Sequence, residues 1–415
     1  MQKVELVART TEIGDVCNRD PESINYDSML IAGKAAGVCY MPDDYLSEGI
    51  QNTEKCIARA NGNKKSGHHS TLEHSHLTFI IHTNKIMAMV LNSINMYVTS
   101  EKSGRWTKMT GNTEIEMEKY NKWLDIFKNI ITGYYKDSKT EKEIEKLAQE
   151  NARYMLDIFY PTVMEYTISY RELSYFICHL QSLINKMKLY IQLRVENDYK
   201  SNFFKRFIES AIELIDAFKE AVFTSDDFII EDIKGGSIRL MEKLLREEEI
   251  IRENISDSYT MLYEASFAEL AQAQRHRTIR YSIVGISNTS FYIPAIIRNT
   301  PYEIEWQKDL TELVEKGLAP SASLLKICEQ GIVEDFVMKC KERLCSRAQL
   351  EICEVTENQA KKFYSSNPHA LSYNNRQLIY DIVDSDGSVK PRCAFTGYIC
   401  HEPCKLGSNG LYRNI

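Results

Sequence analysis

Three short segments of the sequence gather side chains that can bind anions, cofactors or metals. In the first, residues 68–76, four of the nine histidines lie beside Glu73. Imidazole and carboxylate groups are good metal ligands, but their spacing matches no zinc signature such as His-Glu-x-x-His. Two other interpretations stay open for this segment: a loop-to-strand junction whose polar side chains bond the backbone, and a contact to a phosphate or cofactor.

The second segment, Ser100–Trp106, places a glycine between a hydroxyl and a guanidinium. Gly104 lets backbone N–H groups approach an anion closely, and the fork of donors on Arg105 fits a phosphate. Because the same composition is typical of a solvated turn, the segment alone does not decide between the two.

The third segment, Gln272–Arg277, ends an apolar stretch with Arg275, His276 and Arg277. Arg280 follows one helical turn after Arg277, and no acidic residue lies between them. A basic face without an acidic partner predicts a bound anion such as phosphate. The alternative is a solvated helix face.

A fourth group lies in the tail, at Cys393, Cys400, His401 and Cys404. Thiolate and imidazole ligands can hold tetrahedral zinc and so fix a short irregular segment. The spacing is not that of a standard zinc finger, and free buried thiols are the alternative.

The composition limits the partners of this chain. Its 415 residues, 43% hydrophobic and 26% charged, are typical of a globular protein with room for two or three domains. A net charge of -7 argues against a nucleic-acid polymer but allows a local basic pocket for one nucleotide. No apolar run reaches the ~18 residues of a membrane span. Eleven cysteines, an odd number, and an N-terminus without a signal-peptide core predict reduced thiols and a cytoplasmic location.

The spacing of apolar residues predicts the elements that hold these segments. Strands are expected at Lys3–Arg9 and Leu77–Ile81, with loops at 60–67 and 99–107 and an irregular tail after Asn367. Helices are expected at Met29–Tyr40, Lys85–Met96, 113–132, 140–157, 170–195, 202–222, 237–253, 265–277, 303–317, 321–341 and 345–363. The acidic, glycine-containing break Thr224–Gly236 is the best domain boundary.

Taken together, the first three segments resemble the flavin-dependent thymidylate synthase family (ThyX). That family has a His…Ser/Thr…Glu-His segment before a strand and helix, and a signature of Arg-His-Arg followed by Glu-x-Ser-x-Arg-Tyr. The resemblance covers most of the chain and is strongest at 29–110 and 265–353. It is unusual, because the chain carries the pattern twice and divides the signature between the two copies.

The first copy matches the second half of the signature. Its matching residues are His68, Ser70, Glu73, His74, Glu101, Ser103, Gly104 and Arg105, with Trp106 in place of Tyr. Arg153 and Arg171 resemble the family's arginines that contact substrate and flavin. Ser93, Ile94 and Asn95 stand where Arg-His-Arg is expected, and Leu180 replaces an arginine thought to act on the pyrimidine ring.

The second copy matches the other half of the signature through Gln272, Arg275, His276 and Arg277. The segment Lys341–Ile352 resembles the family's C-terminal helix and places Arg343 on the pyrimidine-contacting arginine. The Glu, Ser and Arg of the signature are replaced by Ile283, Gly285 and Ser287. Because the family's active site lies between subunits, a tandem chain can lose half a site in each copy and still assemble complete sites.

The resemblance therefore implies an α/β (α+β) fold of two repeats, at 1–224 and 236–415, each an antiparallel sheet flanked by long helices. A homodimer that imitates the family's homotetramer is expected. The implied reaction is reductive methylation of dUMP at C5 to give dTMP. Methylenetetrahydrofolate is then the carbon donor, FAD the hydride carrier and NADPH the reductant.

The resemblance also assigns roles. The substrate-binding residues are Glu101, Ser103, Gly104, Arg105, Arg153, Gln272, Arg275 and Arg343. The cofactor-binding residues are Ser70, Glu73, Glu101, Arg171, Arg275, His276 and Arg277. Arg343 is the catalytic candidate, because a fixed cation stabilises charge that develops on the pyrimidine. Ser103 is the second, although no His or Asp spacing indicates a base that would activate it.

Two alternatives remain open. A related flavoenzyme would methylate another pyrimidine nucleotide such as UMP, since the contacts to the 2′-position are not readable from the sequence. A degenerate homologue would bind the nucleotide without catalysis.

Overall fold

The computed structural model describes residues 2–11, 20–38, 48–94, 96–105, 107–135, 138–193, 198–230, 238–246, 258–366, 371, 373–400, 404, 411 and 413. The chain divides into two compact units. Unit 1 comprises Met1–Ser103 and Phe159–Arg239, and unit 2 comprises Gly104–Ile158 and Leu240–Ile415. These units differ from the predicted division at Thr224–Gly236, because residues 104–158 fold with the C-terminal half of the chain.

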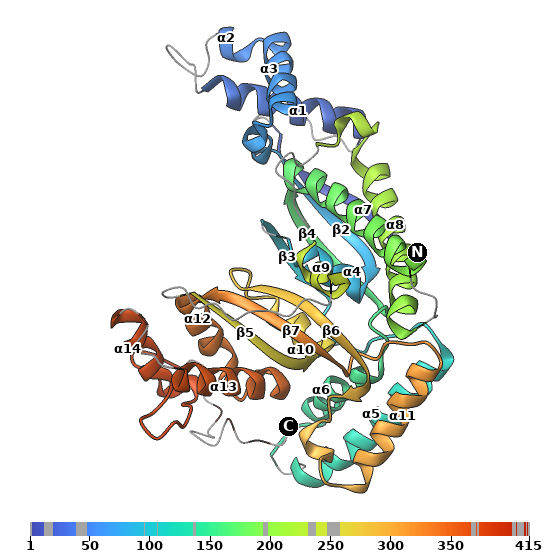
Figure 1. Ribbon diagram of the computed structural model, residues 1–415, viewed down its shortest axis with the longest axis vertical. Helices are drawn as coiled ribbons and strands as arrows, with labels where there is room; N and C mark the ends of the chain where they lie inside the picture. The colour runs from blue at the N-terminus through green and yellow to red at the C-terminus, as the bar shows by residue number, and fades with distance from the viewer. Residues whose placement is uncertain are drawn as a thin grey trace. The chain divides into compact units, whose positions relative to one another are not determined.

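Unit 1 is built on a four-stranded antiparallel sheet in the order β1-β2-β4-β3 (Figure 1). Its strands are β1 (Lys3–Arg9), β2 (His76–Asn84), β3 (Tyr97–Glu101) and β4 (Pro161–Ser169). Its helices are α1 (Pro21–Val38), α2 (Glu48–Gln51), α3 (Thr53–Ser66), α4 (Lys85–Leu91), α7 (Tyr170–Leu193) and α8 (Tyr199–Val222), with 3-10 turns at His69–His74 and Asp226–Phe228.

The core of unit 1 lies between its sheet and the two long helices. Leu77, Phe79 and Ile81 alternate with less buried residues along β2, which places them on one face. On that face the ring of Phe79 meets Phe218 of α8 edge-on, with centroids 5.4 Å apart. Phe218 also contacts Phe176 of α7. The amphipathic patterns predicted at 170–195 and 202–222 thus form α7 and α8.

Helix α3 replaces the loop that was predicted at 60–67. The side chain of Asn52 accepts a hydrogen bond from Lys55 N and begins the helix, and Gly67, at φ 80°, ends it. Helix α1 approaches α3 so closely that a Cβ at Gly33 would lie 2.0 Å from the carbonyl oxygen of Cys56. The loop prediction was wrong because glycine and asparagine are typical of turns, whereas here Asn61, Gly62 and Asn63 lie inside the helix.

Unit 2 is built on a three-stranded antiparallel sheet in the order β5-β7-β6. Its strands are β5 (Ser258–Ser266), β6 (Arg280–Phe291) and β7 (Ser323–Ile332). Its helices are α5 (Glu114–Tyr135), α6 (Glu141–Ala152), α10 (Phe267–Ala273), α11 (Pro301–Glu315), α12 (Val333–Arg343), α13 (Leu350–Ser365) and α14 (Tyr373–Ile382), with 3-10 turns at Arg153–Met155, Ala295–Ile297 and Arg392–Ala394. Helix α9 (Arg239–Arg246) begins at the last residue of unit 1.

Within unit 2, residues 104–158 are bound to the C-terminal half by aromatic and ionic contacts. Trp123 of α5 meets Trp306 of α11 edge-on at 4.8 Å between ring centroids. One turn away, the buried carboxylate of Asp309 accepts hydrogen bonds from Lys119, Lys122 and Trp123 at 2.9, 2.5 and 2.9 Å. Burial opposes the ionisation of Asp309, but these donors outweigh it and lower its pKa.

The two sheets share strand order and register. A shift of 182 residues carries β2 and α4 onto β5 and α10, so that His76 corresponds to Ser258 and Lys85 to Phe267. A shift of 163 residues carries the end of β4 onto that of β7, so that Ser169 corresponds to Ile332. His76 pairs with Ser169 in the first sheet, and Ser258 pairs with Ile332 in the second.

Several elements differ from those predicted. The helix expected at 321–341 is strand β7 followed by α12, because Ser323, Leu325 and Ile327 alternate in burial over the first part. The loop expected at 99–107 begins inside β3, and β4, β5 and β6 were not predicted. The helix expected at Lys341–Ile352 is divided, since α12 ends at Arg343 and α13 begins at Leu350. Part of the tail expected to be irregular is α14.

In the part of the chain that the structure describes, every helix is too short or too polar to span a bilayer.

Replacing Asp309 tests the link between α5 and α11. Asp309→Asn removes a buried acceptor of two ammonium groups, so we expect unfolding to become easier by about 3 kcal/mol in urea denaturation at neutral pH. Because the folded-state pKa is lowered, this contribution is present above the unfolded value of 3.8 and is lost as the pH falls through the folded value.

The matched control is Glu305→Gln, which removes only a half-exposed partner of Lys122. It should change stability by less than about 1 kcal/mol. Equal losses in the two variants would contradict the role given to Asp309.

Candidate functional site

Unit 2 contains predicted site residues from both halves of the sequence. From the first half, Arg105 donates to Glu150 at 3.0 Å and, through Nη2, to the carbonyl oxygen of Arg347 at 3.1 Å. The preceding Gly104 is buried, and a Cβ there would lie 3.3 Å from Met109 and 3.4 Å from Arg153. A larger residue at position 104 would thus press on the side chain of Arg153.

Arg153 and Gln272 are joined by one amide. Nη2 of Arg153, in the turn after α6, donates to Oε1 of Gln349 at 2.7 Å, and Nε2 of Gln272, on α10, donates to the same oxygen. The buried Nε of Arg153 has no hydrogen-bond partner among the described residues. Two predicted substrate-binding residues are therefore held together by Gln349, to which the sequence analysis gave no role.

The amide of Gln349 is itself fixed by a buried chain of hydrogen bonds. It donates to the hydroxyl of Tyr154, which donates to Glu351 at 2.7 Å. Glu351 also accepts from the hydroxyl and backbone N–H of Ser266, at 2.7 and 2.8 Å. Burial raises the pKa of Glu351, although these donors oppose the effect. The Gln349 side chain is thus oriented by groups from β5, α13 and the turn after α6.

Arg343 lies at the end of α12 and binds His276. Its Nε donates to Nε2 of His276 at 2.9 Å, and its Nη2 contacts the carbonyl oxygen of Gln272 at 3.4 Å. Burial, with the charges of Arg343 and Lys339, lowers the pKa of His276 to about 3. The ring is therefore a neutral acceptor, and the tautomer assigned from this contact carries its proton on Nδ1.

The three residues of the Arg-His-Arg segment differ in exposure. His276 is buried, whereas Arg275 and Arg277 are exposed. Arg280 does not continue a helix, as the sequence analysis expected, because α10 ends at Ala273 and Arg280 begins β6. The prediction of a basic helix face was therefore wrong, although Arg275, Arg277 and Arg280 are exposed.

Unit 1 holds the remaining predicted residues, and there the charges are paired. Arg171 binds Glu73 and, at 2.8 Å, Glu172, and its guanidinium lies 5.5 Å from the Tyr175 ring centroid. Its buried Nε has no partner among the described residues. Ser70 is exposed in the same 3-10 turn as Glu73, and Ser103 ends the unit.

Glu101 is almost fully buried and accepts from Lys85 at 2.6 Å and from Thr162 at 3.3 Å. In the second sheet, the positions of Lys85 and Glu101 are occupied by Phe267 and Ile283, so this ion pair exists in one half only.

The histidine-rich segment shows hydrogen bonds of the kind expected at a loop-to-strand junction. His69 contacts the hydroxyl of Tyr175 at 2.6 Å and the carbonyl oxygen of Lys64 at 2.9 Å. Over the described ranges, no three His, Cys, Asp or Glu side chains are placed to hold a metal ion. In the tail, Cys393, Cys400 and Cys404 are described, but His401 lies outside the described residues, and structural zinc stays a prediction.

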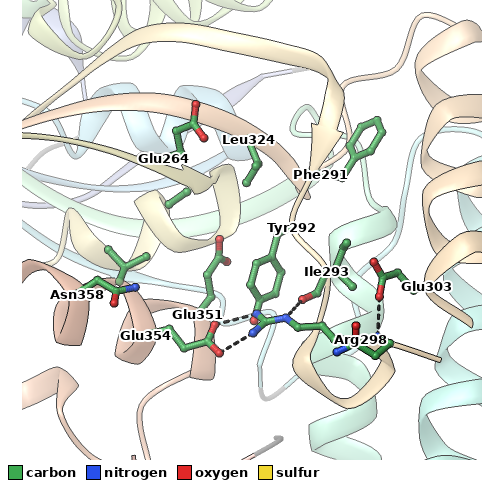
Figure 2. A pocket seen from close by; sticks show the side chains of 13 residues that line it. Glu264, Phe291, Tyr292, Ile293, Arg298, Glu303, Leu324, Glu351, Glu354 and Asn358 are labelled. Atoms are coloured by element: carbon green, nitrogen blue, oxygen red, sulfur yellow. Dashed lines mark hydrogen bonds and ion pairs between the residues drawn. The ribbon is translucent and has the colours of Figure 1, made fainter.

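A cavity of about 460 Å³ in unit 2 lies beside the hydrogen-bond chain (Figure 2). Arg298 is held there by both oxygens of Glu354, at 2.8 Å each, and by the carbonyl oxygen of Ile293 at 2.9 Å. The lining carries the carboxylates Glu264, Glu303, Glu351 and Glu354 against this single arginine. Such a cavity repels phosphate, and none of the predicted nucleotide-binding residues lines it.

The neutral His276 predicts a stability change in acid. Between the unfolded pKa of 6.5 and the folded value of about 3, the unfolded chain binds a proton that the folded protein rejects. Stability should therefore fall below pH 6.5 by up to about 1.4 kcal/mol per pH unit. His276→Gln, whose amide oxygen can still accept from Arg343, should lack this component in urea denaturation. His68→Gln, at an exposed position, should retain it.

Comparison with known proteins gives one family and several solved structures. Residues 24–182 match the family model Thy1, thymidylate synthase complementing protein. No curated protein sequence matches the chain. A UMP/dUMP methylase, PolB from Streptomyces cacaoi, bound with 5-Br dUMP, is 19% identical over 43% of this chain and 77% of its own, with a TM-score of 0.30. ThyX from Helicobacter pylori with FAD and dUMP is 17% identical over 56% of this chain and 98% of its own, with a TM-score of 0.28.

The matched segment includes Ser70, Ser103–Arg105, Arg153 and Arg171, whereas Gln272 and Arg343 lie beyond it. The resemblance to the flavin-dependent thymidylate synthases is thus confirmed over residues 24–182, which carry the sequence pattern of the Thy1 family.

Proposed function

We propose that this protein is a flavin-dependent enzyme that methylates a pyrimidine nucleotide at C5, with dUMP as the substrate and dTMP as the product. The Thy1 match supports the reaction class. The observation that carries the proposal is the contact between Arg153 and Gln272 through Gln349, because it joins substrate-binding candidates from the two halves of the sequence in one unit.

The proposal includes a tandem repeat with a divided site. The shared strand order and register of the two sheets support this. Gly104 and Arg105 from the first repeat, with Arg153, complement Gln272–Arg277 and Arg343 from the second. All of these residues belong to unit 2, so one chain contributes both halves. A homodimer would then contain two such sets.

The residues divide into two roles. Arg105, Arg153 and Gln272 bind the nucleotide phosphate, for which the unpartnered Nε of Arg153 is a buried donor. Arg343 faces the pyrimidine. Its close acceptors are His276 and a backbone carbonyl, both neutral, and the carboxylate of Glu342 lies farther away at 3.6 Å. Its charge is thus left for an electron-rich ring, where it lowers the energy of the transition state more than that of the ground state.

The donor set also fits FAD. The exposed Arg275 and Arg277 of unit 2 suit its diphosphate. When bound, FAD would supply the hydride that reduces the transferred carbon, which methylenetetrahydrofolate provides, and NADPH would restore the reduced flavin. Glu101 is a weaker candidate for either ligand, because Lys85 and Thr162 occupy its carboxylate.

The first test measures flavin binding and turnover. Purified protein mixed with FAD should retain a flavin absorbance spectrum after gel filtration, and with NADPH and methylenetetrahydrofolate it should convert dUMP to dTMP, as detected by mass spectrometry. Faster methylation of UMP than of dUMP would identify UMP as the substrate. Nucleotide binding without turnover would favour the degenerate homologue, and failure to bind FAD would refute the flavoenzyme.

The second test removes the bridge. Gln349→Ala should leave Arg153 and Gln272 without their common acceptor and weaken dUMP binding about tenfold in isothermal titration, the equivalent of ~1.4 kcal/mol. Gln307→Ala, at an exposed position on α11, should bind as the wild type does. Equal affinities in all three proteins would show that the bridge does not form the nucleotide site.

A further inference from the structure

Three buried positions carry uncharged residues in the first half of the chain and acidic or basic residues in the second. Beneath the first sheet, Met87, Tyr166 and Phe176 are buried. The shifts of 182 and 163 residues that relate the two halves carry these positions onto three charged residues, also buried: Glu269 on α10, Glu329 on β7 and Lys339 on α12.

The fold does not need these charges, because the first half forms the same sheet without them. Burying an ion pair is often no more stabilising than packing apolar side chains of similar volume. Stability alone therefore does not explain the charges at these three positions. In the second half, one member of that cluster, Lys339, lies on the same helix as Arg343, and the first half has Leu180 at the position of this arginine.

Two members of the cluster satisfy one another. Lys339 donates to Glu329 at 2.7 Å and to Gln359 at 2.8 Å, and Gln359 donates to Glu329 at 2.9 Å. The hydroxyl of Tyr259 donates to the other oxygen of Glu329 at 2.8 Å. Glu329 and Lys339 thus form a closed pair.

Glu269 is different, because neither of its carboxyl oxygens has a hydrogen-bond partner among the described residues, although its side chain is fully buried. The nearby hydroxyls of Tyr263 and Tyr281 are also buried without a partner there. Its pKa is raised to about 8, first by burial, with Glu351 and Glu329 adding to the effect and Lys339 and Arg343 opposing it.

The position of Glu269 in its helix explains why its carboxyl is unpartnered. Ser266 and Glu269 have the spacing of a capping box, and the Ser266 hydroxyl accepts from Glu269 N at 3.1 Å. The reciprocal contact is missing, because Ser266 N donates to Glu351 instead. In α6, by contrast, Glu143 completes the box with Thr140. Because Glu351 accepts the hydrogen bond from Ser266 N, the carboxyl group of Glu269 does not cap the helix and stays buried without a partner among the described residues.

Ionisable groups face Glu269 from every element around it. They are Tyr263 on β5, Tyr281 on β6, Glu329 on β7, Lys339 and Arg343 on α12, and Glu351 on α13. Lys339 is engaged by Glu329 and Gln359, whereas Arg343 has only neutral acceptors at hydrogen-bond distance. Arg343 also approaches the helix that carries Glu269, because its Nη2 contacts the carbonyl oxygen of Gln272, one turn after Glu269 on α10.

We propose that Glu269 is a positioning residue for Arg343: as a neutral acid it leaves the guanidinium its full charge for the nucleotide, and as a carboxylate it competes for that charge. This inference rests on the function proposed above. The proton that Glu269 loses passes to solvent, so no other reactant is involved.

The test compares the wild type with Glu269→Gln, which has the same shape and no ionisable proton. Affinity for dUMP, measured by isothermal titration between pH 7 and 8.8, below the pH at which the uracil ring itself ionises, should fall severalfold in the wild type and stay constant in the variant. Glu269→Asp should restore a fall at high pH. Glu118→Gln, at an exposed position on α5, should behave as the wild type does.

Thermal unfolding without nucleotide gives a second readout that is independent of the proposed function. Between the unfolded pKa of 4.5 and the folded value of about 8, the unfolded chain releases a proton that the folded protein keeps, so wild-type stability falls as the pH rises. The Tm of Glu269→Gln relative to the wild type should therefore increase up to pH 8 and then level off.

A Tm difference that does not depend on pH would refute the buried acid. Nucleotide binding with the same pH dependence in both proteins would refute its action on Arg343. No nucleotide binding at any pH would refute the proposed function and the positioning role with it, while leaving the Tm result as a separate measurement of the acid.

Discussion

A single amide group, that of Gln349, has to satisfy three neighbours in the interior of unit 2. Its oxygen accepts from Arg153 and Gln272, and its nitrogen donates to Tyr154. An amide is the side chain that can do both, because it carries an acceptor and two donors on one planar group. A carboxylate there would lose the contact to Tyr154, and a hydrocarbon would leave a buried guanidinium without an acceptor, which is costly. The site therefore depends on this residue more than on any one arginine.

The chain meets that requirement by joining distant segments through the backbone. Ile158 donates to the carbonyl oxygen of Ala319 at 2.7 Å, and Ser321 donates to that of Leu156, also at 2.7 Å. Asp157 accepts from Ala319 N at 3.0 Å. These bonds fix the turn that carries Arg153 against the beginning of β7. Asp309 on α11 holds α5, at the other end of the same segment, through Lys119, Lys122 and Trp123. The arginine is thus placed by elements that contain no catalytic residue.

Much of the fold was predictable, and the exceptions have a common cause. Long amphipathic helices such as α5, α7 and α8 show a clear period, and β1 shows an alternation that only a strand produces. The strand β7 was taken for a helix because its sequence runs without a break into that of α12, and the alternation in burial of Ser323, Leu325 and Ile327 covers only its first part. For the site, the resemblance to the family gave the prediction of Arg153, Gln272 and Arg343. The pairing of Glu101 with Lys85 and the bridge by Gln349 depend on contacts between segments remote in sequence, which one sequence does not reveal.

The interrupted path of the chain through its two units also sets an order of synthesis. The ribosome makes residues 104–158 of unit 2 first and then residues 159–239, which belong to unit 1. The rest of unit 2 is made only from residue 240 onward. During translation, Trp123 and the ammonium groups of Lys119 and Lys122 on α5 have no counterpart until Trp306 and Asp309 leave the ribosome. At about 5–20 residues per second, that interval lasts roughly 10–40 s. For that time the face of α5 that packs against α11 in the folded protein lacks its partner.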